Sequence, residues 1–231
     1  MKKSCKIVFL GFLLVCCHPV MAQQTEKKLV KGILHTVIHL KNGETAEGYL
    51  QNSFTVGGLP VSTSYHIPSG LDSVMRIKTD NKMFERSTKY RNQEIDSMIT
   101  WYDAHPDEKM KWEPQPVVFA FGDNEPVTDD YPSMLLVVYE GKHVKGYWSY
   151  HPAWGFKYLF MMSDMPYAQA FLIPDQKFSE HRRKTLLGTF YMYPEMEDFI
   201  KSLTKNTIKE DPLCILRKLD QVITEENKQG N

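Results

Sequence analysis

Two histidines four positions apart, His35 and His39, have the spacing of two zinc ligands on one face of a helix. The surrounding residues alternate between apolar and polar, which predicts a strand. Four residues of strand span roughly 13 Å, at about 3.3 Å per residue. Two histidines that far apart cannot bind one metal ion, so we expect them on the polar face of a hairpin.

The acidic stretch GDNEPVTDDY, residues 122–131, places four carboxylates in one loop: Asp123, Glu125, Asp129 and Asp130. Clustered carboxylates suit calcium, a hard cation that takes six or more oxygen ligands. The stretch lacks the ligand spacing and the central glycine of an EF-hand. We expect a solvated turn without a cofactor, and calcium binding is the alternative.

The densest aromatic region is YWSYHPAWGFKYLF, residues 147–160. Aromatic rings on a sheet can stack on sugars or on the side chains of a partner. Most of these rings must form the core, but the loop after the strand at 144–150 places Trp154 at a tip. The predicted ligand contacts are therefore Trp154, His151 and Tyr147.

The sequence contains no local catalytic motif that we recognise. A G-x-S-x-G elbow, an H-E-x-x-H pair and the glycine-rich phosphate and dinucleotide loops are all missing. Cys214 is expected to be a packing residue of a helix. No catalytic residue is predicted, although an enzyme that assembles its residues from distant parts of the chain is the alternative.

Residues 1–22 have the pattern of a secretory signal peptide. Three lysines precede a short apolar run, and Ala22 stands just before the expected cleavage ahead of Gln23. The alternative is a lipid anchor on Cys16 or Cys17, which directly follow the apolar run. The expected localisation is periplasmic or secreted, and no later apolar run is long enough to cross a membrane.

Cleavage would remove three of the 28 basic residues and none of the 28 acidic ones. The mature chain would then be mildly acidic and would lack the basic footprint of a nucleic-acid-binding protein. Cys214 would be the one cysteine left of four, which excludes an intrachain disulfide.

Residues 23–102 read as short strands separated by turns. Asn42-Gly43 is a hairpin signal because both residues tolerate a positive φ. Strands are expected at 34–40, 45–50, 54–66, 74–78, 83–87 and 95–101. The fold predicted for this part is a small antiparallel β-barrel or sandwich.

Residues 103–116 hold three prolines and a mixed charge run, and they predict a linker between two domains. Residues 117–226 predict an antiparallel β-meander followed by two or three C-terminal helices, because the apolar period changes from two to about 3.6 after Pro174. The helices are expected at 178–191, from Pro194, and from Asp211 as N-cap. Residues 227–231 predict a disordered tail, and the fold class is α+β.

The stretch HLKNGETAEGYL, residues 39–50, resembles the first half of the Sm-like signature. In that family a turn glycine and a second glycine five residues later, here Gly43 and Gly48, allow a strongly bent strand. The second half of the signature, which contacts RNA, has no counterpart in residues 77–98. The resemblance implies a bent hairpin in an SH3-like or Sm-like barrel and no nucleic-acid partner.

The layout as a whole is similar to that of uncharacterised secreted proteins of Bacteroides-type bacteria. The resemblance implies an exported cell-envelope protein and names no activity. The leading hypothesis is a non-enzymatic binding or interaction module with an envelope protein or a glycan as partner. The alternative is a hydrolase acting on envelope or glycan material. The sequence does not indicate an oligomeric state.

Overall fold

The computed structural model describes residues 34–51, 73–79, 86–119, 127–128, 131–151, 155–172 and 178–229. The proposed signal peptide, the strand expected at 54–66 and residue Trp154 lie outside these ranges. Within them the chain forms a β-rich sheet followed by helices, which confirms the α+β class.

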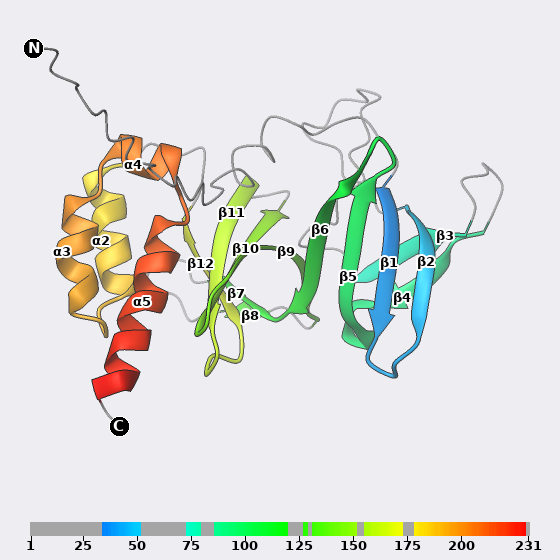
Figure 1. The fold of residues 1–231 in the computed structure, drawn as a ribbon, viewed down its shortest axis with the longest axis horizontal. Helices are drawn as coiled ribbons and strands as arrows, with labels where there is room; N and C mark the ends of the chain where they lie inside the picture. Colours follow the sequence, from blue (N-terminus) through cyan, green and yellow to red (C-terminus); the bar gives the residue numbers. More distant parts are fainter. Residues whose placement is uncertain are drawn as a thin grey trace, which may run out of the picture.

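The first strands are β1 (Leu34–Leu40), β2 (Thr45–Leu50), β3 (Val74–Lys78), β4 (Thr88–Arg91), β5 (Ile95–Tyr102) and β6 (His105–Gln115). They are followed by β7 (Val117–Phe119), β8 (Val127–Thr128), β9 (Ser133–Glu140), β10 (Val144–His151), β11 (Gly155–Met162) and β12 (Ala168–Leu172). In the described residues they form one sheet in the order β4-β3-β2-β1-β5-β6-β9-β10-β11-β12-β7-β8 (Figure 1). The antiparallel run from β9 to β12 confirms the predicted meander for these four strands, but β7, the strand expected to open it, instead pairs in parallel with β12.

The predicted hairpin forms as expected. Gly43 has a φ of 88°, and the side chain of Asn42 accepts a hydrogen bond from the backbone N–H of Glu44 at 3.0 Å. At Gly48 a Cβ would lie 2.2 Å from the carbonyl oxygen of Lys78 in β3. Glycine is therefore required at this point because the two strands approach so closely.

Residues 103–116 were predicted to be a linker, but most of them form a strand of the sheet. Residues 105–115 form β6, which pairs with β5 on one edge and with β9 on the other. The prolines that indicated a linker are tolerated in the strand: Pro114 lies opposite Met134 in the pairing with β9. One sheet therefore runs through both halves of the chain.

The helices are α2 (Glu180–Thr189), α3 (Glu195–Ser202), α4 (Lys205–Glu210) and α5 (Cys214–Gln229). α4 was not predicted, and Asp211 ends it as a C-cap instead of beginning the last helix. α5 extends to Gln229 and so includes part of the expected tail. Figure 1 shows the helices grouped on the β10–β12 side of the molecule.

The two faces of the sheet bury different clusters. The main core joins residues of the N-terminal strands, such as Ile38 and Met98, to Trp112, to Trp148 and to the helices. α5 lies directly on β10: a Cβ at Gly146 would be 2.5 Å from Leu216. A second, smaller cluster lies apart from it: Val117, Leu135, Tyr147, Leu159 and Ala168, with Val137, Met161 and Ala170 packed against them.

Candidate functional site

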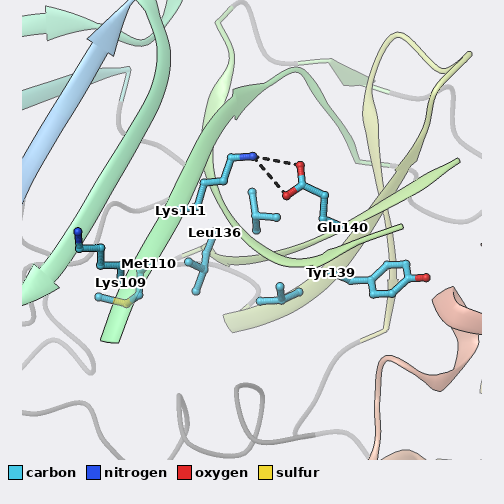
Figure 2. A pocket seen from close by; sticks show the side chains of 8 residues that line it. Lys109, Met110, Lys111, Leu136, Tyr139 and Glu140 are labelled. Carbon is cyan, nitrogen blue, oxygen red and sulfur yellow. Dashed lines mark hydrogen bonds and ion pairs between the residues drawn. The ribbon is translucent and has the colours of Figure 1, made fainter. Parts of the chain in front are cut away.

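A cleft opens in the sheet where the pairing of β6 and β9 ends. The two strands pair from Gln115 opposite Ser133 as far as Trp112 opposite Leu136. Beyond that point they diverge, and the space between them has a volume of 280 Å³ (Figure 2). Its lining residues are Lys109, Met110 and Lys111 of β6 and Leu136, Val137, Val138, Tyr139 and Glu140 of β9.

The alternation of the strands gives the cleft an apolar side and a charged side. Met110, Leu136 and Val138 belong to the main core or pack against it. The charged side is built from Lys109, Lys111 and Glu140. Lys111 lies opposite Ile99 of β5, and the ammonium group of Lys109 lies 5.4 Å from the ring centroid of Trp101, also of β5. Because residues two positions apart on a strand share a face, both lysines project from the same face of β6.

A network of ion pairs fixes the charged side. The Nζ of Lys111 donates to Glu140 and to Glu113, each at 3.0 Å. The Nζ of Lys145 lies 2.9 Å from Glu113 and 3.4 Å from Glu140. The hydrogen bonds with Glu113 and Glu140 raise the pKa of Lys111, and the hydrogen bond from Lys111 lowers the pKa of Glu140. Lys111 and Glu140 are therefore both charged at neutral pH.

Glu113 is the buried centre of this network, with 7% of its surface exposed. Burial raises the pKa of its carboxyl group, but the hydrogen bonds from Lys145 and Lys111 outweigh that effect, so the pKa lies below its ordinary value. The hydroxyl group of Tyr147 donates a further bond to Glu113 at 3.0 Å. Burial raises the pKa of Tyr147 far above its ordinary value, so this phenol remains a donor.

The far end of the cleft is tied to helix α5 through Asp220. Its carboxylate accepts hydrogen bonds from the backbone N–H groups of Lys142, His143 and Val144 at 3.1, 2.6 and 3.0 Å, and from the hydroxyl group of Tyr139 at 3.3 Å. Burial raises the pKa of Asp220, yet the three backbone bonds outweigh it and leave the pKa below the ordinary value. The turn after β9 is therefore held by the helix.

This arrangement is suited to binding. Lys111 and Glu140 of the rim are held by hydrogen bonds before any ligand arrives, and the apolar side offers Met110 and Val138, which are only partly buried. Beyond Trp112 and Leu136 the facing edges of the two strands share no pairing, so backbone donors and acceptors of the described cleft residues are available to a ligand.

The structure describes only part of the sites predicted from sequence. Tyr147 is buried in the second cluster, where its hydroxyl group supports the rim through Glu113. His151 ends β10, with its backbone opposite Gly155, and Trp154 lies outside the described residues. The ligand role of these three residues stays a prediction. Most of the acidic stretch 122–131 also lies outside the described residues.

His35 and His39 lie on β1, as the alternation predicted. His35 is half-buried, and its ring lies edge-on to the ring of Trp101 with 4.4 Å between the centroids. Its Nε2 lies 3.4 Å from a carboxylate oxygen of Glu47. His39 is exposed. Among the described residues, no three His, Cys, Asp or Glu side chains come together as a group that could hold a metal ion.

Sequence reasoning missed the cleft and its charged rim. Glu113 and Lys145 are 32 positions apart, and their contact depends on β9 lying between the strands that carry them.

Comparisons with family models, with curated proteins and with solved structures each returned no match. In the part of the chain that the structure describes, every helix is too short or too polar to cross a membrane.

Proposed function

We propose that this protein is a non-enzymatic binding module of the bacterial cell envelope, exported to the periplasm or secreted, and that its ligand binds in the cleft between β6 and β9. The observation that carries the proposal is the cleft itself: an apolar side of Met110, Leu136 and Val138 faces a charged rim of Lys109, Lys111 and Glu140. A few fixed polar groups beside apolar surface are the usual composition of a binding site.

The rigidity of the surrounding elements supports this proposal. β6 is held by β5 along the cleft, β9 is held by β10, and Asp220 of α5 fixes the turn between β9 and β10. A site whose groups are already in place loses less conformational entropy when a ligand binds. The ion pairs among Lys111, Glu113 and Glu140 serve the same purpose at the rim.

The N-terminal part of the chain is proposed to be a small barrel or sandwich of the SH3-like or Sm-like kind. Leu34, Ile38, Leu50 and Met75, from β1, β2 and β3, are all fully buried in the main core. The close approach of β2 to β3 at Gly48 supports a bent hairpin. In this proposal the N-terminal part is a scaffold that supports β5 and β6.

The test is saturation-transfer NMR with a panel of capped peptides and soluble glycan fragments. Val138→Phe would fill the cleft, and Thr45→Phe, which places the same ring at an exposed end of β2, is the matched control. We expect at least one class of the panel to bind the wild type and the Thr45→Phe variant and to lose binding to Val138→Phe. A panel that binds nothing, or that binds Val138→Phe equally well, would contradict the proposal.

The proposed export needs its own test, because residues 1–22 lie outside the described residues. Intact mass and fractionation of the protein expressed in a Bacteroides-type host would give the mature N-terminus. A soluble species that begins at Gln23 is expected. A membrane-bound species with acyl chains on Cys16 or Cys17 would instead indicate the lipid-anchored alternative.

A further inference from the structure

The shape of the cleft restricts the kind of ligand. Its volume of 280 Å³ is slightly below the range of about 300–1,000 Å³ that is typical of pockets for compact small molecules. Its walls are strand edges: Lys109–Lys111 on one side and Val137–Glu140 on the other. A ligand that lies along the strands can therefore contact both walls.

The walls also offer a particular pattern of hydrogen bonds. β6 pairs with β5 at Lys111 and Met110, and β9 pairs with β10 at Val137 and Tyr139 with a bulge at Val138, so each strand keeps a partner on its outer edge beside the cleft. The edges that face each other there have no pairing in the described residues. Their N–H and C=O groups match the backbone of a third extended chain.

The two sides of the cleft restrict the side chains of such a ligand. Successive side chains of a strand point to opposite faces. One set would meet Met110 and Val138, which favour apolar groups, and the other set would meet Lys109 and Lys111. Of the three charged residues that line the cleft, two are the cations Lys109 and Lys111 and one is the anion Glu140. Charge complementarity therefore favours carboxylates in the second set.

We propose that the ligand is an extended segment of a partner protein, with alternating apolar and acidic residues, that enters between β6 and β9 as an added strand. This inference rests on the proposed function, because it names the ligand class of the same cleft. The sheet would then become continuous beyond Trp112 and Leu136. Specificity would come from Lys109 on the charged side and from Met110 and Val138 on the apolar side.

The experiment uses the capped pentapeptide acetyl-Val-Glu-Val-Glu-Val-amide as probe, with isothermal titration to measure affinity and hydrogen exchange to locate binding. Three control peptides are matched to it: one with lysine in place of glutamate, one with glutamine, and one with N-methyl groups on alternate residues, which removes backbone donors. The full mature chain is used throughout. Lys109→Glu tests the charged side, and Lys205→Glu, an exposed position on α4, is the matched control.

We expect the acidic peptide to bind and to slow amide exchange in residues 109–111 and 137–140. Lys109→Glu should weaken binding about fivefold, the size of an exposed ion-pair contribution of about 1 kcal/mol, whereas Lys205→Glu should not change it. The lysine peptide and the N-methylated peptide should bind more weakly than the probe.

The outcomes separate this inference from the proposed function. If a glycan fragment binds in the cleft and the peptide does not, the inference is wrong and the binding module stands. If the peptide protects amides of β4 instead, or if N-methylation has no effect, strand addition at this cleft is refuted. If neither peptide nor glycan binds in a manner sensitive to Val138→Phe, the proposed function fails as well.

Discussion

Replacing the buried carboxylate Glu113 with the neutral amide of glutamine tests whether the ion-pair network stabilises the fold. The amide keeps the shape of the side chain, and its oxygen can still accept the hydrogen bond from Tyr147. It loses the charge-assisted bonds from Lys145 at 2.9 Å and from Lys111 at 3.0 Å. The two ammonium groups then keep only Glu140 as a partner in this network.

The expected loss is about 2 kcal/mol in the free energy of unfolding. A hydrogen bond to a charged group contributes about 1.5–3 kcal/mol when it is well shielded from water. Lys111 and Lys145 are 38% and 35% exposed, so water can solvate them after the change, and the total stays near the lower end. For a chain of this size a loss of about 2 kcal/mol corresponds to a Tm lower by about 4–8 °C.

The pH dependence follows from the direction of the pKa shift. Because the pKa of Glu113 in the folded protein lies below its ordinary value, the carboxylate stabilises the fold above the unfolded pKa of about 4.3. That contribution is lost as the pH falls through the lowered folded pKa. The difference between wild type and Glu113→Gln should therefore be full at pH 7 and shrink steadily below about pH 4.3.

Urea unfolding followed by tryptophan fluorescence at several pH values is the assay. Asp107→Asn removes an exposed carboxylate from the same strand and is the control. A Glu113→Gln loss within about 0.5 kcal/mol of the Asp107→Asn loss, the ordinary range for a surface substitution, would refute the reasoning. So would a difference that does not change with pH.

Three further perturbations have clear expected results. Asp220→Ala removes the acceptor of three backbone N–H groups and should cost about 1–3 kcal/mol in urea unfolding, with faster amide exchange in the turn after β9. Gly48→Ala should destabilise the fold because its Cβ would meet the backbone of Lys78. Gly188→Ala lies in open space on α2 and should stabilise the fold by about 0.5–1 kcal/mol. Equal Tm shifts of the two variants would contradict this. Burial raises the pKa of Cys214 to about 11, so iodoacetamide at pH 7.5 should alkylate it more slowly than free cysteine, and an equal rate would contradict this.

The sequence predicts the parts of this fold that depend on local patterns. The Asn42-Gly43 turn needs only its two residues and the alternating strands beside them. The strands from β9 to β12 follow one another along the chain and pair with their neighbours, so their order also follows from the pattern. The apolar stripe of α5 is visible in the sequence as the repeat of Ile215, Leu219 and Val222.

The errors arise where long-range pairing overrides local preference. Pro106 and Pro114 and the surrounding charges are typical of a linker, yet β5 and β9 pair with both edges of this segment and hold it as β6. The same error concealed the candidate site. Lys111 and Glu113 belong to β6 and are two positions apart. This spacing places their side chains on one face only if the segment is a strand, which the linker interpretation excluded.

The parallel pairing of β7 with β12 has a consequence for the order in which the chain folds. Val117 and Val118 of β7 pair with Ala168 and Gln169 of β12, so roughly fifty residues must be synthesised before this contact can form. Each strand from β10 to β12 can instead pair with the one just before it as soon as it leaves the ribosome. β7 therefore joins the sheet late, and during that interval its valines are free to pair with the wrong strand.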